Sequence, residues 1–263
     1  MYEPRDYRRW IEGEGLCAFE VSVGESDLYI RAGRDLRGEA FKAVNRCRSH
    51  IEGYIERHPE FLSFLLPLVV AEDAPPIIKQ MAEASQKALV GPMAAVAGAI
   101  AEFVGRELLP FASEVIVENG GDIFLAGSSR RLVGVYAGES PFTGKIALEI
   151  QPEEMPLGVC TSSGTVGHSL SAGSADAVIA LSSWTALADA AATAIGNIVC
   201  GEEDIPRALS FAQGIDGLSG AAVIVGDRVG LWGRVKIIRT LDEDSGNCEG
   251  VLDKPPDVCH HIK

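Results

Sequence analysis

The strongest constraint on the fold is the grouping of strand-like segments along the chain. Four apolar segments with only short turns between them follow one another between residues 113 and 151. Helical patterns come before this group and after it, but not between its strands. Strands joined by short turns pair antiparallel, whereas a parallel sheet needs a crossover after each strand. The sequence therefore predicts an α+β fold with mixed, largely antiparallel sheets and helices packed between and against them.

The composition predicts one domain with a tightly packed core. The chain has 263 residues, of which 47% are hydrophobic but only 6% aromatic, and it contains 29 glycines. Such a core is built from Ala, Val, Ile and Leu, and it favours close approach of backbones over large side chains. We expect a single domain over residues 1–240 and a C-terminal tail over residues 241–263.

The charge balance limits the classes of partner. There are 23 Lys and Arg against 37 Asp and Glu, a net charge of −14. Sequence-independent binding to nucleic acid or to an anionic membrane needs clustered basic residues, so we expect neither partner. The six cysteines are dispersed, and no apolar leader segment is present. These features predict reduced thiols and a cytoplasmic protein, and they leave a homo-oligomer open.

The segment "VENGGDI" contains the most informative turn signal. Asn119, Gly120, Gly121 and Asp122 lie between two apolar runs. Asn-Gly and Gly-Gly supply the positive φ angles of a two-residue hairpin turn. Two glycines between an amide and a carboxylate also let a ligand approach the backbone. The residues alone leave open whether this is a turn or a binding site.

A carboxylate stands inside an alanine-rich helix predicted over residues 184–196. Asp189 there needs a partner, because burial of an unpaired carboxylate costs several kcal/mol. The candidates are backbone N–H groups, an arginine or a cation. Thr193 follows one helical turn later on the same face. The pair suits a hard cation if phosphate oxygens or water complete its coordination, and an ordinary hydrogen bond is the alternative.

A hydroxyl-rich loop follows the strand predicted from residue 157. Thr161, Ser162, Ser163 and Gly164 stand in it, with His168 shortly after. Backbone amides and hydroxyls of this kind can hold a phosphate. A serine nucleophile with His168 as its base is conceivable, although the chain has no G-x-S-x-G elbow. A loop without any chemistry is the other interpretation.

The order of these motifs resembles the ApbE superfamily, whose characterised members are FAD:protein FMN transferases. The shared order is a Gly-opened helix of small residues, then "VENGGDI", "TSSG" and "ALADAAATA", and it resembles most the shorter, uncharacterised relatives. The resemblance implies FAD or FMN as ligand, with contacts from the hairpin residues and from the loop. It also implies a Mg²⁺ site. The implied nucleotide contacts are Asn119, Gly120, Gly121, Asp122, Thr161, Ser162, Ser163 and Gly164, and the implied magnesium ligands are Asp189, Thr193 and the carbonyl of Ala94.

The chain also departs from the pattern of the characterised transferases. Ala95-Val96 stands where they have Lys-Gly, and their His-x-x-Asp-Pro segment is represented only by His168. We therefore expect an ApbE-like protein that binds a flavin-type nucleotide with a divalent cation and transfers FMN to protein weakly or not at all. The alternative is an active magnesium-dependent transferase with an acceptor protein as partner, in which His168 and Asp189 are catalytic. A cytosolic hydrolase that uses Ser163 and His168 ranks lower.

Overall fold

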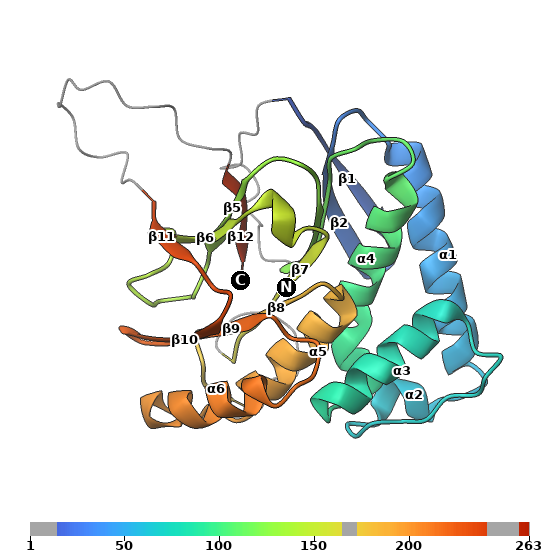
Figure 1. Cartoon of the computed structure of the whole chain (residues 1–263). Helices are drawn as coiled ribbons and strands as arrows, with labels where there is room; N and C mark the ends of the chain where they lie inside the picture. The colour runs from blue at the N-terminus through green and yellow to red at the C-terminus, as the bar shows by residue number, and fades with distance from the viewer. Residues whose placement is uncertain (1–14, 165–172, 241–257, 263) are drawn as a thin grey trace.

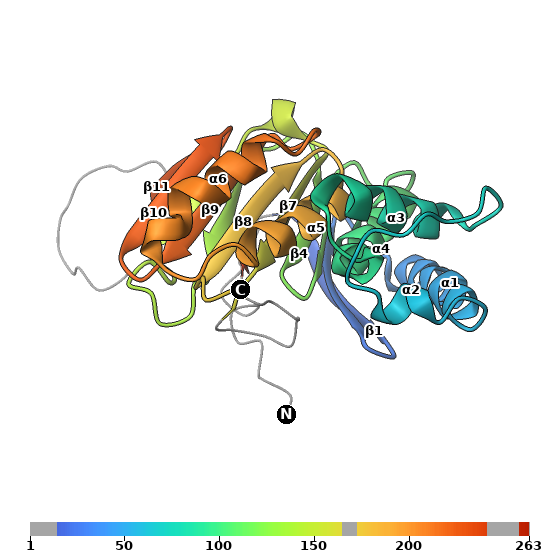
Figure 2. The same ribbon diagram turned by 90° about the horizontal axis from the view of Figure 1, so that it is seen from below.

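An eight-stranded sheet forms the middle layer of the molecule (Figures 1 and 2). The structure is a computed structural model that describes residues 15–164, 173–240 and 258–262. Every neighbouring pair in this sheet is antiparallel. In spatial order the strands are β1 (Cys17–Val23), β2 (Ser26–Ala32), β3 (Val115–Asn119), β4 (Asp122–Ala126), β7 (Leu157–Ser162), β8 (Ala177–Ser182), β9 (Gly220–Val225) and β10 (Arg228–Gly233).

The helices cover one face of this sheet. Along the sheet, α1 lies over β1, α4 over β3 and β4, α5 over β7 and β8, and α6 over β9 and β10 (Figure 2). Helix α3 packs on α5, α4 and α1 from outside. The helices are α1 (Arg37–Ile55), α2 (Glu60–Ser63), α3 (Pro76–Ala88), α4 (Val96–Leu108), α5 (Thr185–Gly196) and α6 (Ile205–Gln213), with 3-10 turns η2 (Pro92–Ala95), η3 (Pro152–Glu154) and η4 (Glu202–Asp204).

A smaller sheet contributes the residues that pack on the other face. Its strands, in spatial order, are β11 (Ile237–Arg239), β6 (Ile146–Ile150), β5 (Arg131–Val135) and β12 (Val258–Ile262). β12 runs parallel to β5, and the other two pairs are antiparallel. β12 lies within residues 241–263, the range for which the sequence predicts a C-terminal tail. Its backbone extends the edge of β5, a pairing with no local sequence signal.

Side chains of the central strands point alternately to the two faces of the sheet, and both faces are covered. This explains why the sequences of these strands are continuously apolar. Val115 and Val117 pack in the hydrophobic cluster under the helices, whereas Ile116 between them packs toward the smaller sheet. On β4, Phe124 points to the helices and Ile123 to the smaller sheet. A strand with both faces covered needs apolar residues at every position. The predicted α+β class with largely antiparallel sheets is confirmed.

The apolar run over residues 228–240 is divided between the two sheets. Its pattern in the sequence predicts a single strand, but β10 ends at Gly233 and β11 begins at Ile237. Gly233 has a φ of +74°, and a Cβ there would lie 2.3 Å from Ser219 O. The chain turns at this glycine, and Arg234 N–H then donates to Ser219 O at 2.8 Å. The apolar runs on both sides gave no sign of the break.

No single helix in the described part of the chain is long and apolar enough to cross a bilayer. Helix α3 and the η2–α4 segment reach the required length and composition only together, and they are bent by 106°.

Small residues let α4 lie close to its neighbours, as the composition predicted. Gly105 faces the ring of the fully buried Phe124. A Cβ at Gly105 would lie 2.1 Å from Phe124 Cδ1, far inside van der Waals contact. Helix α4 can therefore pack this closely on β4 only because position 105 has no side chain.

We expect Gly105→Ala to destabilise the protein by roughly 1–3 kcal/mol, because the added methyl overpacks the contact with Phe124. Gly53→Ala on α1 is the matched control, since a Cβ there meets nothing within 4 Å. It should stabilise the protein by about 0.5–1 kcal/mol through better helix propensity. Urea unfolding followed by circular dichroism measures both changes. Equal stability of the two variants would contradict the packing argument.

Candidate functional site

The segment between β3 and β4 is a two-residue hairpin turn. Asn119 pairs with Asp122, and Gly120 and Gly121 between them have φ angles of +69° and +106°. Positive φ at both central residues is the signature of a type I′ turn, so the two glycines are required by the backbone alone. Gly120 is exposed, and a Cβ at this position would meet nothing within 4 Å. The turn therefore leaves open space where a ligand can approach.

Two polar side chains fix this turn against the start of α4. Asn119 Nδ2 donates to Ala97 O at 3.1 Å, which ties the end of β3 to the first turn of the helix. The fully buried Glu118 accepts a hydrogen bond from Gly121 N–H at 2.9 Å through Oε1. The hairpin and the N-terminus of α4 thus form one rigid unit.

Helices α4 and α5 cap each other. Asp189 of α5 accepts a hydrogen bond from Gly98 N–H at 2.8 Å, in the first turn of α4. Glu102 of α4 accepts a hydrogen bond from Thr185 N–H, the first residue of α5, also at 2.8 Å. The first amides of a helix have no partner within the helix, and a carboxylate there also interacts with the positive end of the helix dipole. Each helix therefore supplies the missing acceptor of the other.

The crossing of α4 and α5 depends on Gly98. A Cβ at Gly98 would lie 2.7 Å from Asp189 Cβ and 2.7 Å from Thr185 O. Their position just before α5 makes Ser182 and Ser183 the local candidates to cap this helix, but neither side chain caps it. Ser182 Oγ instead accepts from Trp184 N–H at 3.1 Å, one residue before the helix. The local serines were a weaker signal than a buried glutamate from another helix.

A second carboxylate, Asp122, acts electrostatically on Asp189. Asp122 is only 6% exposed, and its Oδ1 accepts a long hydrogen bond from Thr161 N–H at 3.3 Å. Burial, together with the nearby Glu118, raises the pKa of Asp122 to about 7. Burial and the charge of Asp122 raise the pKa of Asp189 well above its usual value, against the opposing backbone N–H groups of Gly98 and Ala97. Within the described ranges, neither carboxylate forms an ion pair with Lys or Arg.

The buried thiol of Cys160 lies with these carboxylates. Its side chain contacts Asp122 and also donates a hydrogen bond to Thr185 O at 3.4 Å. Burial and the two carboxylates raise the pKa of the Cys160 thiol well above its ordinary value, so it is held protonated. Cys160 therefore acts in this site as a neutral neighbour of Asp122 and not as a thiolate.

The donor chemistry of this region suits a hard cation whose coordination is completed by a ligand. Asp122 and the partly buried Asp189 have no basic partner among the described residues, so they repel each other when both are ionised, and a cation between them removes that cost. Across the described ranges, no three or more His, Cys, Asp and Glu side chains are placed to hold a metal ion. The described side chains therefore do not form a metal site whose ligands all come from the protein. Two carboxylates leave most of an octahedral shell to water or phosphate oxygens.

The other predicted magnesium ligands lie close to Asp189 along the chain or in space. Thr193 is partly buried, one helical turn after Asp189. Ala94 lies in η2, one turn before Gly98, and η2 packs against α5. Among the described residues, no hydrogen bond joins either of them to the Asp189 carboxylate, so their roles as ligands stay predictions.

Thr161 and Ser162, which the sequence predicted in the hydroxyl-rich loop, are the last two residues of β7, beside Asp122, and the loop begins at Ser163. Thr161 Oγ1 and Ser162 Oγ are buried and lack a hydrogen-bond partner in the described structure. Gly164 N–H donates to Ala175 O at 3.0 Å, which returns the chain toward β8. Ser163 is 6% exposed. His168 lies outside the described residues, so its predicted catalytic role and its pairing with Ser163 stay predictions.

A cleft of about 660 Å³ opens on the other side of the Asn119–Ala97 contact. It lies between α1, α2, the start of α4 and the turn that joins β1 to β2. Sequence reasoning missed it, because its walls come from segments that lie far apart in the chain. The only local signal was the four-residue spacing of Arg48 with Glu52 and of Ile51 with Ile55 on α1, which is also typical of any surface helix.

Comparison with known proteins places the chain in a family. A family model described as "AbpE bacteria" matches residues 8–231. The chain belongs to this ApbE-like family. The "UPF0280 protein" of Methanococcus aeolicus is 39% identical over 230 residues, which cover 85% of this chain and 93% of the relative. The "UPF0280 protein MJ1526" of Methanocaldococcus jannaschii is 44% identical over 229 residues, covering 84% and 92%.

Two solved structures of similar fold are named as flavin transferases. The flavin transferase ApbE from Vibrio cholerae is 11% identical with a TM-score of 0.55, over 82% of this chain and 96% of that one. The apo flavinyl transferase ApbE of Pseudomonas stutzeri is 14% identical with a TM-score of 0.52, over 86% and 94%. At this identity the likeness concerns the ApbE fold alone. The predicted resemblance to an uncharacterised ApbE-like subgroup is confirmed.

The raised pKa of Asp122 predicts a specific dependence of stability on pH. An acid whose pKa is higher in the folded state favours folding below its unfolded pKa, and this contribution is lost as the pH rises through the folded pKa. We therefore expect wild-type protein, without metal or nucleotide, to lose stability between about pH 4 and pH 7 relative to Asp122→Asn, which stays neutral. The difference in the free energy of unfolding between the two proteins should be on the order of a few kcal/mol at pH 7.

Urea unfolding in the presence of EDTA, at several pH values between 4 and 8, measures this difference. Asp73→Asn, at an exposed loop position, is the matched control. A difference between wild type and Asp122→Asn that does not grow with pH would refute the proposed burial of an ionisable carboxylate.

Proposed function

We propose that this protein binds a flavin-type nucleotide, FAD or FMN, together with a divalent cation such as Mg²⁺, and transfers FMN to protein weakly or not at all. The site is the region where the β3–β4 turn, the start of α4 and Asp189 of α5 meet. The observation that carries the proposal is the pair formed by the buried Asp122 and the partly buried Asp189, which has no basic partner among the described residues.

The cation is supported by this carboxylate pair. Asp189 was expected to bind Mg²⁺ with Thr193 and the Ala94 carbonyl, and the position of Asp122 makes it a further candidate ligand. Gly98 N–H fixes one oxygen of Asp189 at 2.8 Å and so orients the carboxylate. When bound, Mg²⁺ would neutralise charge on the phosphate oxygens of the nucleotide, which complete its coordination.

Binding of the phosphates is supported by the groups around the carboxylates. The turn at Gly120 leaves room for a ligand, and the buried hydroxyls of Thr161 and Ser162 have no hydrogen-bond partner among the residues that the structure describes. Unpaired buried hydroxyls are costly, and they are rare unless a ligand or water uses them. The names of the structural neighbours, flavin transferases from Vibrio cholerae and Pseudomonas stutzeri, favour a flavin nucleotide over other nucleotides.

Weak transfer is supported by what the chain lacks relative to the characterised transferases. Transfer to an acceptor threonine or serine needs a positioned base as well as a cation. His168 is not followed by the Asp-Pro pair of those enzymes, and Ala95-Val96 replaces their Lys-Gly. A protein that holds the nucleotide without efficient turnover fits this combination.

The cation and the nucleotide should bind together. We expect isothermal titration of Mg²⁺ to give heat in the presence of FAD and little heat in its absence, because two carboxylates alone bind Mg²⁺ weakly. Asp189→Asn should abolish the FAD-dependent heat, whereas Asp227→Asn, at an exposed turn position, should leave it unchanged. Tight Mg²⁺ binding without FAD, or full binding in Asp189→Asn, would speak against the proposed site.

Transfer of FMN should be at least about a hundredfold slower than that of an active ApbE enzyme, because His168 lacks the Asp-Pro pair that accompanies the histidine of the characterised transferases. The protein is incubated with FAD, Mg²⁺ and an acceptor domain, and covalent flavin is read by in-gel fluorescence. The Vibrio cholerae flavin transferase serves as the positive control. Rapid labelling that is lost in both His168→Ala and Asp189→Ala would instead establish the active transferase.

A further inference from the structure

Most of the exposed large apolar side chains gather on the outside of the helix layer. The connection between α2 and α3 runs there, away from both sheets (Figures 1 and 2). Of the nine large hydrophobic side chains that are exposed among the described residues, six lie on α2, on this connection or at the end of α3. These six side chains form the outer patch, which consists of Leu62, Phe64, Leu65, Leu66, Val69 and Leu89.

The outer patch is large for a protein that works as a monomer. Val69 is 90% exposed and Leu65 is 72% exposed, so these side chains make little contact within the chain. Together the six side chains expose several hundred Å², whereas the largest apolar patch on a typical monomer covers roughly 300–600 Å². Scattered apolar residues on a surface need no partner, but six in one place indicate an interaction surface.

The backbone beneath the patch is held in place by the rest of the protein. Phe61, at the start of the segment, is buried in the core, and Gln86 Nε2 donates to Leu68 O at 3.0 Å. Between these two points, Phe64 O lies against Gly91, where a Cβ would be only 2.0 Å away. The apolar side chains therefore stay exposed on a fixed backbone. A partner that covers them meets a surface that is already ordered, which lowers the entropy cost of binding.

Leu89 is an independent sign that the patch has a partner. It ends α3 in the left-handed conformation, with a φ of +60°, where glycine is the usual residue. A leucine in this conformation is strained, and its side chain is also mostly exposed. It lies two residues before Gly91, the residue that Phe64 contacts. Neither backbone conformation nor burial within the chain favours leucine here, whereas a contact with another molecule does.

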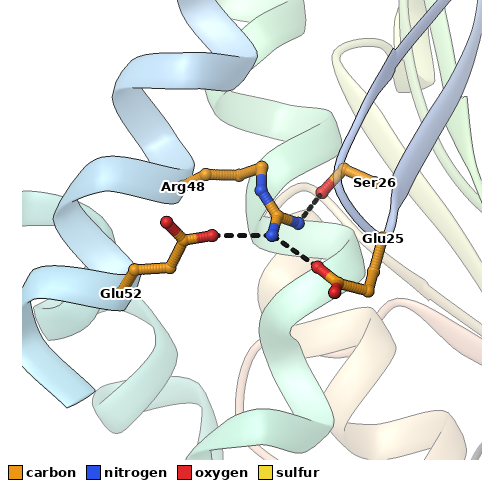
Figure 3. A network of polar contacts seen from close by, with 4 residues as sticks. All are labelled: Glu25, Ser26, Arg48 and Glu52. Atoms are coloured by element: carbon orange, nitrogen blue, oxygen red, sulfur yellow. Dashed lines mark hydrogen bonds and ion pairs between the residues drawn. The ribbon is translucent and has the colours of Figure 1, made fainter. Parts of the chain in front are cut away.

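The basic group of the neighbouring cleft is, by contrast, paired within the chain. Arg48 Nη2 donates to Glu52 Oε1 at 2.6 Å and also bonds to Glu25 (Figure 3). Its Nη1 group donates to Ser26 Oγ at 3.1 Å. This side of the cleft has its hydrogen bonds satisfied, so the surface that lacks a partner is the apolar segment and not the charged cluster.

The charges that flank the outer patch suit a second copy of the chain. Residues 61–71 contain no charged side chain. Arg57 precedes this stretch, and Glu72, Asp73 and Lys79 follow it; all four are exposed and form no ion pair among the described residues. Both signs of charge are therefore available, and a twofold axis can bring acidic residues of one copy opposite basic residues of the other.

We infer that the outer patch is the interface of a homodimer, in which the same surface of two copies packs together about a twofold axis. A standard interface takes about 800 Å² from each partner, which the apolar patch supplies together with its charged rim. Leu62 belongs to the patch and also lines the cleft of about 660 Å³. The second copy therefore lies at the opening of this cleft.

Sedimentation velocity of the full-length protein, from micromolar to hundreds of micromolar concentration, tests this inference. We expect wild type to pass from monomer to dimer within this range. Leu65→Glu and Leu66→Glu each place a charge in the patch and should raise the dimer dissociation constant at least about tenfold, because the charge must be buried without a partner. Leu231→Glu, at a 46% exposed position on β10, is the matched control and should dimerise as wild type does.

Two further measurements guard against misfolding of the variants. Circular dichroism checks that each variant keeps its fold, as expected for changes of exposed side chains. In unaltered wild type, hydrogen exchange of the amides of residues 62–69 should slow as the protein concentration rises.

A wild type that stays monomeric throughout the concentration range overturns the inference. A dimer that Leu231→Glu breaks and both patch variants leave intact overturns it as well. If a monomeric wild type instead binds phosphatidylcholine vesicles and Leu65→Glu does not, the patch is a surface for lipid and not for a second copy.

Discussion

The exchange of caps between α4 and α5 is the contact on which the site depends. Asp189 satisfies the amide of Gly98, Glu102 satisfies the amide of Thr185, and Gly98 leaves just enough space for the helices to cross. Because each carboxylate is fixed by backbone donors, the helices cannot slide or rotate without breaking a buried hydrogen bond. The proposed cation ligand is thus held by the same contact that sets the packing of the helix layer.

Around this contact, the charged side chains of the protein define two different regions. On one side, Asp122 acts electrostatically on Asp189 and neither has a basic partner in the described structure, an arrangement that a cation and phosphates can neutralise. On the other side, the cleft presents carboxylates with one arginine and apolar walls. Asn119 stands between the two regions and belongs to both.

Local signals in the sequence predicted most of the elements but little of the geometry between them. The order of strands and helices followed from apolar periodicity and from prolines and glycines, and the hairpin at Gly120 and Gly121 followed from turn chemistry. The hairpin at Gly120 and Gly121 can be both a turn and a binding site, because the residues with the positive φ angles that make the turn also leave it open to a ligand. The break at Gly233 was missed since apolar residues continue on both sides of it. The cap from Glu102 and the cleft were missed because both depend on residues that meet only in the folded chain.

The distance along the chain between the capping partners has a consequence for the order of folding during synthesis. Thr185 lies 83 residues after Glu102, and Asp189 lies 91 residues after Gly98. While the ribosome is making the strands in between, α4 has been released without either of its partners from α5. Such long-range contacts close late, since the chain must lose much loop entropy before they form. The helix layer, and with it the pocket for any ligand, can therefore close only after nearly three quarters of the chain has left the ribosome.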